Sequence, residues 1–403
     1  MKRVLIFYGN QLCYNTLNIF AKSIESCLEK MGHEVILADA YTDEEDFINC
    51  VENAARSGTD AALAFNADGN ILACRDVLNE YRIPLYDWIV DHPCDHIKVL
   101  NAPVDNLNVI TLDRDHAGFI ERHIDNVRSA HTIPLGGFQS GESLDLCEES
   151  FHNRKYGLIF TGSYVPYTQF EDSILSLPDR MRKVTVLMIE YMLTNRMATN
   201  EEALDHALRE VIGTDQIPSS VYQECAYYTS NSNIYVRHYI REEMMRFIVD
   251  SGVRIDIFGP GWERLGFDKK KNVVLHDRVD YVESAKACSE AKLSLNIMPW
   301  FKNGLHDRIP TAMMNGSAVV TDASRYIDEV FVKEGDDQDI FLFDIRDPGS
   351  APKYIMDCLS DEDRLYRVAR RGRDRSLAEL TWEARAAELV RAIGPGKRKT
   401  IQT

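Results

Sequence analysis

The stretch "RVLIFYGNQLCYNTLNIFAKSIESCLEKMGHEVILADA", residues 3–40, reads as a strand, a helix and a second strand. Residues 3–9 form a continuous apolar run that ends in glycine, which is typical of a buried parallel strand. The apolar residues of segment 17–31 fall at helical spacing, and Gly32 closes that helix. Apolar strands joined by a helix predict a parallel sheet that helices cover on both faces.

The same alternation continues in two blocks. In the first block, further strand-like segments lie at residues 60–66, 84–91, 108–115 and 130–137. After a polar stretch at 138–155, a second block begins at 156–164, passes through a mainly helical stretch, and resumes at residues 253–262, 272–279, 292–299, 316–322 and 339–344. The sequence therefore predicts an α/β protein of two tandem, Rossmann-like doubly wound domains, with a helical insertion in the second.

We expect three regions along the chain. Residues 1–150 are predicted to form the first domain, 151–380 the second, and 381–403 a C-terminal helix and tail that braces the two. The length of 403 residues agrees with two domains, each with its own core. This architecture predicts a cleft between the domains, with the carboxyl ends of both sets of strands facing it.

The composition indicates which classes of partner and which cellular compartment to expect. The net charge of −17 disfavours nucleic acid and anionic membrane surfaces as partners. The nine cysteines are scattered and never form C-x-x-C, which indicates free thiols in a reducing cytosol. No apolar stretch is long enough for a membrane span, so we expect a cytoplasmic protein without integral membrane contact.

Three chargeable side chains precede a short, apolar helical run in "NGLHDRIPTAMMNGSAVVTD", residues 303–322. Pro310 in the first turn and Gly316 after the end are typical of a helix. Its free N–H groups, together with Arg308 and His306, would suit a diphosphate. Asp307 would cap the helix or hold the arginine. The alternative is a capped helix with a surface arginine.

Two glycine-containing loops follow strands of the second block. "FTGSY" contains Gly162, and "FGPGW" contains Gly259 and Gly261. Glycine permits close approach of the backbone to a ligand. Neither loop matches G-x-G-x-x-G or a P-loop, so binding of a dinucleotide or a nucleoside triphosphate is poorly supported.

The segment "DHPCDH", residues 91–96, ends a strand of the first block. A zinc site would need helical geometry and a third ligand, and Pro93 disfavours a helix there. We favour His92 as a residue that contacts the reacting centre, oriented by Asp91 or Asp95. The alternative is that these residues cap the next helix. Likewise, segment 113–115 (Asp-Arg-Asp) is interpreted as polar residues at a strand end, and no metal site is predicted.

Several motifs resemble one known family, the CgeB-like, group 1 glycosyltransferases, which are two-domain enzymes of GT-B fold. The resemblance is carried by "DIFGPGW" (256–262), "LSLNIMPWFKNGLHDRIPTAMMNGSAVVTDAS" (293–324), "LTWEARAAELV" (380–390), "DHPCDH" (91–96), "ITLDRDHAGFI" (110–120) and "IPLGG" (133–137). It covers most of the chain and is strongest over about residues 253–325. It implies that the second domain binds a nucleoside-diphosphate-sugar, with UDP or GDP favoured.

The resemblance and the motifs together give a set of candidate site residues. Those expected to bind the donor are Gly162, Ser163, Gly259, Pro260, Gly261, Trp262, Asp277, Arg278, Val279, Asn296, Asp307 and Thr311. Those expected to be catalytic are His92, His306 and Arg308, and those expected on the acceptor side are Gly9, Asn10, Asp91 and Asp113. No cofactor is expected beyond the donor.

The implied reaction is metal-independent transfer of a sugar, with retention at the anomeric carbon, to a protein, glycan or small-molecule acceptor. One departure concerns Thr311, because the wider family often has a glutamate there that grips the ribose. A hydroxyl would bind that ribose less strongly. Two alternatives therefore stay open: a degenerate GT-B module that binds a sugar nucleotide without turnover, and a GT-B epimerase or sugar-phosphate phosphorylase.

Overall fold

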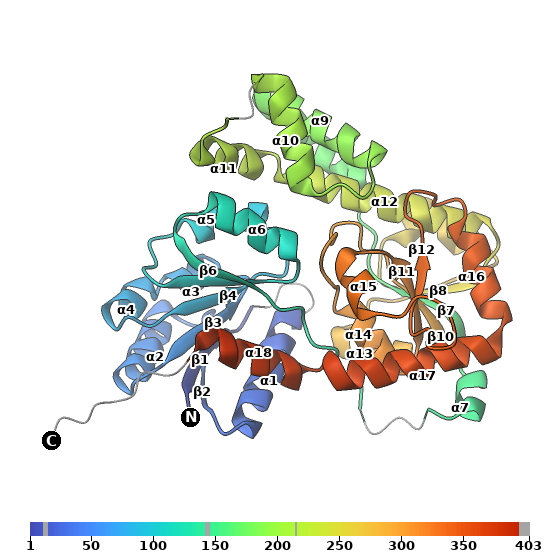
Figure 1. Cartoon of the computed structure of the whole chain (residues 1–403), viewed down its shortest axis with the longest axis horizontal. Helices are drawn as coiled ribbons and strands as arrows, with labels where there is room; N and C mark the ends of the chain where they lie inside the picture. The colour runs from blue at the N-terminus through green and yellow to red at the C-terminus, as the bar shows by residue number, and fades with distance from the viewer. Residues whose placement is uncertain (11–14, 142–145, 214–215, 395–403) are drawn as a thin grey trace. The chain divides into compact units, whose positions relative to one another are not determined.

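The structure is a computed structural model that describes residues 1–10, 15–141, 146–213 and 216–394 (Figure 1). The chain divides into two compact units. The first contains residues 1–135 and the segment from Trp382 onward, and the second contains residues 136–381. Segment 136–150, which we expected in the first domain, belongs to the second unit. There the Gly137 N–H donates to the Leu380 carbonyl at 2.8 Å.

The first unit contains a six-stranded, wholly parallel sheet. Its strands are β1 (Arg3–Tyr8), β2 (Glu34–Asp39), β3 (Ala61–Phe65), β4 (Leu85–Trp88), β5 (Leu107–Thr111) and β6 (Val127–Thr132). They are arranged in the order β2-β1-β3-β4-β5-β6, so the order reverses between β1 and β3. Every residue of β3, β4 and β5 is buried, including the polar Asp87 and Asn108, as expected for inner strands of a parallel sheet.

Short helices connect these strands. They are α1 (Thr16–Lys30), α2 (Glu44–Arg56), α3 (Gly69–Leu72), α4 (Arg75–Glu80), the 3-10 turn η2 (Pro93–His96), α5 (Ile97–Leu100) and α6 (Arg114–His123). Aspartates that follow or precede strands start several of them: Asp43, Asp68 and Asp113 accept first-turn N–H groups of α2, α3 and α6.

A cluster of aromatic rings joins the end of the chain to the first unit. Helix α18 (Trp382–Ile393) packs on α1. The Trp382 ring lies 5.3 Å from Phe20 and 6.1 Å from Trp88, and Trp88 stacks on Phe65 at 5.2 Å. The C-terminal helix therefore completes the core of this unit. Its expected role as a brace between the domains stays a prediction.

The second unit contains another six-stranded parallel sheet. Its strands are β7 (Tyr156–Thr161), β8 (Ile255–Phe258), β9 (Val273–His276), β10 (Ala291–Leu295), β11 (Ala318–Asp322) and β12 (Phe341–Phe343). The order is β12-β11-β10-β7-β8-β9, so it reverses between β7 and β10. This is the Rossmann order, and the reversal is where such sheets bind ligands, at the carboxyl ends of the strands.

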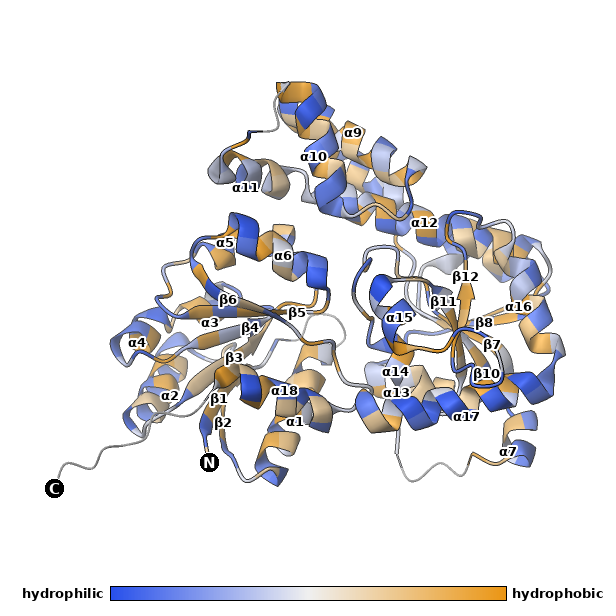
Figure 2. Ribbon diagram, in the orientation of Figure 1, coloured by the Kyte–Doolittle hydropathy of each residue, from blue (hydrophilic) through white to orange (hydrophobic). Residues whose placement is uncertain are grey.

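Most of the remaining second unit is helical. Its elements are α7 (Glu148–His152), η3 (Tyr167–Phe170), α8 (Glu171–Leu175), α9 (Asp179–Thr194), α10 (Asn200–Ile212), α11 (Ser219–Tyr228), α12 (Ser230–Asp250), η4 (Trp262–Leu265), η5 (Phe267–Lys269), α13 (Tyr281–Ser289), α14 (Arg308–Met314), α15 (Arg325–Val330), α16 (Ala351–Ser360) and α17 (Glu362–Glu379). Helices α8 to α11 form the predicted insertion after β7. Helix α14 is almost wholly buried, whereas much of α17 is hydrophilic (Figure 2).

None of the helices in the described part of the chain is long and apolar enough to cross a membrane.

Candidate functional site

The candidate site lies at the strand-order reversal of the second sheet. Strand β7 ends at Thr161 and continues into Gly162 and Ser163. Strand β10 ends at Leu295, and the loop after it, residues 296–307, leads to α14. Because the neighbouring strands carry their connections to opposite faces, a crevice is expected at their carboxyl ends.

Arg308 is anchored at this reversal. Its Nη1 donates to the Thr161 carbonyl at 3.0 Å, and its Nη2 lies 3.2 Å from His306 Nε2. A guanidinium only donates, so Nε2 of the imidazole is the acceptor. The other ring nitrogen, Nδ1, lies 2.7 Å from Asp307 Oδ1 and 3.3 Å from the backbone nitrogen of Arg308. The three consecutive residues thus form a chain of hydrogen bonds that orients the arginine.

This chain continues into α13 and to the start of the second unit. The Tyr281 hydroxyl donates to Asp307 Oδ2 at 2.9 Å and lies 3.1 Å from the Thr311 hydroxyl, which accepts from the Phe138 N–H at 3.2 Å. Thr311 is only 4% exposed. The ribose contact implied by the resemblance therefore finds no support here, because the Thr311 hydroxyl is bonded within the protein.

The protonation states follow from burial and from the neighbouring charges. Burial, followed by the charge of Arg308, lowers the pKa of His306 to about 4. Burial alone would raise the pKa of Asp307, but His306, Arg308 and the Tyr281 hydroxyl outweigh it and hold that pKa below its usual value. Burial and Asp307 raise the pKa of Tyr281 well above its usual value. At neutral pH the site therefore holds a neutral imidazole, a carboxylate and a protonated phenol.

Two more arginines lie beside Arg308, and our sequence reasoning missed both. The guanidinium groups of Arg237 and Arg241, on α12, lie 5.0 and 5.3 Å from the centre of the Trp300 ring. That ring is 5.7 Å from His306. The available signal was the spacing in "RHYIR", residues 237–241, which places both arginines on one face of a helix.

Arg241 carries a buried hydrogen-bond donor without a partner. Its Nε is buried and has no hydrogen-bond partner among the described residues. Burial, followed by the charges of Arg308 and Arg237, lowers the pKa of Arg241 well below its usual value. Like charges held this close repel one another in a medium of low polarity. A bound anion would relieve that repulsion.

The nearby carboxylates only partly offset these charges. Asp307 is bonded to His306 and Tyr281, as described above. Asp322 is 1% exposed, its Oδ1 accepts the Met298 N–H at 2.7 Å, and burial raises its pKa. A further cation, Lys302, lies in the same loop region and donates to the Arg196 carbonyl. The side chains described here give this end of the sheet a net positive charge, although the net charge of the whole chain is −17.

The first N–H groups of α14, which we expected to face an anion, have partners within the protein. Ile309 N–H donates to the His306 carbonyl at 3.1 Å, Pro310 has no N–H, and the Arg308 backbone nitrogen lies 3.3 Å from His306 Nδ1. An anion beside Arg308 would therefore be held by groups other than these, and the anion site itself stays a prediction.

The glycine-containing loops pack against each other. A Cβ on Gly259, whose φ is +136°, would lie 2.7 Å from the Gly162 carbonyl, and one on Gly261 would lie 2.5 Å from the Tyr164 carbonyl. The Trp262 indole is fully buried and donates to the Gly162 carbonyl at 2.8 Å. The glycines are thus required by contact between two loops, whereas we had expected contact with a ligand. Pro260 is exposed in this turn, and Ser163 is half-buried.

The remaining predicted donor residues lie on either side of the reversal. Asp277, Arg278 and Val279 follow the edge strand β9, with the first two exposed, and lead to Tyr281. Asn296 is 3% exposed and bridges to β11, donating to the Thr321 hydroxyl at 2.9 Å. Its Oδ1 is buried and has no partner among the described residues, so it is available to a ligand.

In the first unit, His92 is a buried capping residue. Its Nδ1 accepts the Cys94 N–H at 3.1 Å, and its ring meets His116 edge to face at 4.5 Å. This geometry corresponds to the capping alternative, and the catalytic role of His92 stays a prediction. Asp113 likewise caps α6, accepting the Asp115 N–H at 2.7 Å.

The other acceptor-side candidates lie near the reversal of the first sheet. Gly9 follows β1 with φ +104°, and its N–H donates to Asn18 at 2.8 Å. The Asn10 carbonyl accepts from the same Asn18 side chain at 2.9 Å. Asp91, after β4, accepts from Asn66 at 3.3 Å. These contacts fix the strand ends, and binding of an acceptor here stays a prediction.

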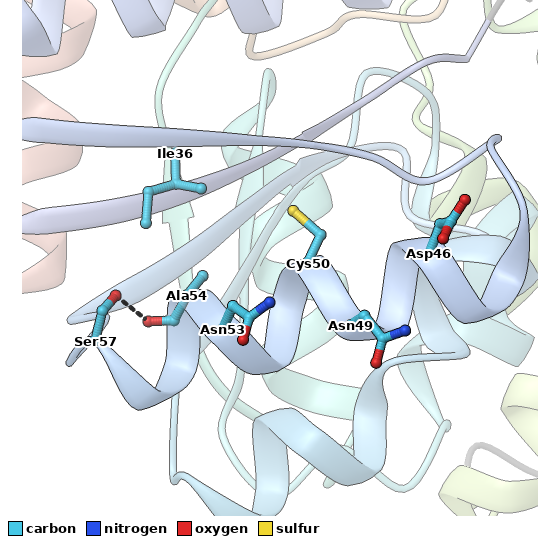
Figure 3. Close-up of a pocket in the computed structure, with 7 residues that line it drawn as sticks. All are labelled: Ile36, Asp46, Asn49, Cys50, Asn53, Ala54 and Ser57. Carbon is cyan, nitrogen blue, oxygen red and sulfur yellow. Dashed lines mark hydrogen bonds between the residues drawn. The ribbon is translucent and has the colours of Figure 1, made fainter.

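A groove of about 550 Å³ on the first unit lies between α2 and the edge strand β2 (Figure 3). It is lined by Ile36, Asp46, Asn49, Cys50, Asn53, Ala54 and Ser57. In the close-up, the Cys50 side chain points toward the strand. The lining has no basic residue, so the groove is not suited to a diphosphate.

Comparison with known proteins identifies the fold. Residues 237–391 match the family model described as glycosyl transferase-like. HepE of Anabaena, solved with UDP and glucose, superposes with a TM-score of 0.53 at 10% identity, over 98% of this chain and 99% of the other. Sucrose-phosphate synthase of Thermosynechococcus elongatus gives 0.51 at 13%, over 96% and 97%. No curated protein sequence matches the chain. The chain has the GT-B fold, as we expected.

Proposed function

We propose that the protein is a glycosyltransferase whose donor is a nucleoside-diphosphate-sugar. The observation that carries the proposal is the convergence of Arg237, Arg241 and Arg308 at the strand-order reversal of the second sheet. All three arginines lie within the segment that matches the glycosyl transferase-like model. The complex of HepE with UDP and glucose supports the choice of donor class.

In this proposal the arginines act on the leaving diphosphate. Negative charge develops on that group as the bond to the sugar breaks, and preorganised donors stabilise such charge most effectively. Arg308 is preorganised by Thr161 and His306, and His306 is itself held by Asp307. A neutral His306 accepts from Arg308 without adding another cation to the cluster. Asn296 Oδ1 offers an acceptor for a sugar or ribose hydroxyl.

The finer parts of the proposal rest on the sequence resemblance. They are membership of the CgeB-like group, UDP or GDP as the nucleotide, retention at the anomeric carbon, metal independence, and a cytoplasmic location. The acceptor is proposed to be a protein, glycan or small molecule, bound on the side of the first unit. The remaining predicted donor and acceptor residues belong to this part of the proposal as well.

One observation favours a second candidate, a module that binds a sugar nucleotide without turnover. Thr311 stands where the wider family often has a glutamate, and its hydroxyl is bonded to Phe138 and Tyr281. A weaker hold on the ribose would affect turnover more than binding of the diphosphate.

A thermal-shift screen against UDP, GDP, ADP, CMP and dTDP tests the donor site. A ligand at about 100 times its Kd stabilises a protein by about 2.7 kcal/mol, which is readily seen as a rise in Tm. We expect one diphosphate to raise the Tm of the wild type and of Arg264→Ala, which removes an exposed arginine elsewhere in the unit. Arg241→Ala should reduce the rise to about half or less at the same ligand concentration. If no nucleotide stabilises the protein, the donor assignment fails.

Turnover then separates the two candidates. Release of the free diphosphate from the matching nucleotide-sugar, in the presence of a panel of acceptors, is expected of a transferase. Binding that Arg241→Ala weakens, with no release of diphosphate under any condition, would instead support the non-catalytic module.

A further inference from the structure

A second group of side chains that could bind a ligand lies where α7 packs on α17. Among the described residues, Glu148, His152 and Asp363 are the group whose ligand atoms lie within 4.8 Å of one another, close enough to hold a metal ion. We propose that these three residues bind a divalent transition-metal ion, for which Zn²⁺ is the probe. The proposal is independent of the function proposed above.

Sequence spacing and packing bring the three side chains together. Glu148 and His152 occupy positions i and i+4 of α7, so they lie on one face of that helix. Phe151, which is fully buried, packs against Tyr366 of α17 with ring centres 5.5 Å apart. The Tyr366 hydroxyl also donates to the Leu146 carbonyl at 3.2 Å. These contacts fix α7 on α17, where Asp363 lies in the first turn.

The ligand atoms of the three side chains have no hydrogen-bond or ion-pair partner among the described residues, although the His152 ring packs against Tyr366. Within the described residues, the carboxylates of Glu148 and Asp363 form no hydrogen bond or ion pair, whereas the adjacent Glu362 is paired with Lys292 at 2.6 Å. His152 Nε2 is buried and has no hydrogen-bond partner there. A helix dipole accounts for an acidic residue in a first turn, but it does not account for an imidazole that converges with two of them.

The ligand set defines the class of ion. One imidazole and two carboxylates are a donor set of nitrogen and oxygen that suits Zn²⁺ and related divalent ions better than Ca²⁺ or Mg²⁺. Ligand atoms around tetrahedral zinc lie about 2.0–2.2 Å from the metal, so they are roughly 3.3 Å apart. Small side-chain rotations would achieve this spacing from the present one. The fourth position would be filled by water, and the ion would clip α7 to α17.

Calorimetric titration with ZnCl₂ tests the site, with the exposed thiol removed by Cys147→Ser so that it cannot supply a ligand. We expect one saturable Zn²⁺ per chain. His152→Ala, Glu148→Gln and Asp363→Asn should each weaken binding by at least about 100-fold, since even residues outside the ligand sphere contribute about 10–100-fold. Glu149→Gln, a neighbouring exposed carboxylate, should bind as tightly as the parent.

Glu148→Gln and Asp363→Asn leave the contact of His152 with Tyr366 intact, so a loss of binding in them cannot come from misfolding of α7. Saturating Zn²⁺ should also raise the Tm of the parent but not of these variants. Equal binding by the parent and by all three ligand variants, or no binding by the parent, would overturn the proposal. Neither result would affect the donor site, which is tested with nucleotides.

Discussion

The two sheets are built alike but differ in charge at the edge where ligands of such sheets bind. In the first unit, aspartates lie at or just beyond the strand ends: Asp39, Asp68, Asp91 and Asp113. In the second, strand-end aspartates such as Asp322 are joined by three arginines, Arg237, Arg241 and Arg308. The fold determines where a ligand can bind, and the side chains at that place determine which charge it can have. An anionic donor is therefore expected in the second unit.

The buried groups differ in the same way. In the first sheet, Asp87 is fully buried, with Oδ1 accepting the Ala67 N–H at 2.9 Å and Oδ2 without a partner among the described residues. Burial raises the pKa of Asp87 to about 7. In the second unit burial lowers the pKa of a base, His306, to about 4. In both units burial disfavours the charged form, of an acid in the first and of a base in the second.

The largest expected effect removes the aromatic core of the first unit. Trp382→Ala should lower the stability of that unit by about 3–5 kcal/mol, because it deletes a buried indole that contacts Phe20 and Trp88. Hydrogen–deuterium exchange of β3 and β4 should rise, and Trp382→Phe should restore much of the protection. Unchanged exchange in the alanine variant would show that α18 is dispensable for this core.

Opposite pH responses should follow from the two buried groups. The raised pKa of Asp87 contributes stability that is lost as pH rises from about 4 through 7, whereas the lowered pKa of His306 contributes stability that is lost as pH falls from about 6.5 through 4. At 1.36 kcal/mol for one unit of pKa, the full effect is about 4 kcal/mol for Asp87 and about 3 kcal/mol for His306. Urea unfolding of wild type, Asp87→Asn and His306→Asn across pH 4–8 measures both.

Subtracting the free energy of unfolding of each variant from that of the wild type isolates the contribution of the substituted group. That difference should vary with pH in opposite directions for the two substitutions. The same trend in both, or a flat difference, would contradict the assigned protonation states.

A third prediction concerns the charge of the second edge. Arg241→Ala should weaken binding of the matching nucleoside diphosphate by about 10–100-fold, since hydrogen bonds to charged groups contribute about 1.5–3 kcal/mol. Arg241→Lys should retain part of the affinity because it keeps the charge. Calorimetry measures both, and an alanine variant that binds like the wild type would place the diphosphate elsewhere.

The smallest effect compares one glycine from each sheet. Gly259→Ala should destabilise by about 1–3 kcal/mol, because a Cβ there meets the backbone of Gly162 and the φ is positive. Gly9→Ala should cost less, because the Cβ meets mainly side-chain atoms of Asp39 and Tyr41, which can move. Chemical denaturation measures the loss of stability in each variant. A larger loss in Gly9→Ala than in Gly259→Ala would show that the loop at 259 adjusts its backbone to the added Cβ.

Much of the fold was predictable because the spacing of apolar residues within short segments indicates strands and helices. The run at residues 3–9 corresponds to β1, and the helical spacing at 17–31 corresponds to α1, displaced by one residue. The strand orders were not predictable in the same way, because pairing joins segments that are distant in the chain. The order of each sheet determines which loops meet, so the composition of the site depends on it.

The site was predictable only in part, for the same reason. His306, Asp307 and Arg308 are adjacent in sequence, and their association followed from one motif. Arg237 and Arg241 lie on an ordinary helix, where arginines usually face solvent, and only the tertiary structure brings them to Trp300. Glycine is required at 259 and 261 by contact with another loop, which sequence alone did not indicate, and their predicted contact with a donor stays a prediction.

The return of α18 to the first unit has a consequence for biosynthesis. Trp382 completes the core of the first unit, so that core cannot form fully until the ribosome has synthesised residue 382. At about 5–20 residues per second, the intervening segment 136–381 takes on the order of tens of seconds to synthesise. During that time the surface of Phe20, Phe65 and Trp88 that Trp382 later covers is not yet covered by it. Nascent chains of this protein should therefore depend on chaperones most strongly just before residue 382 emerges.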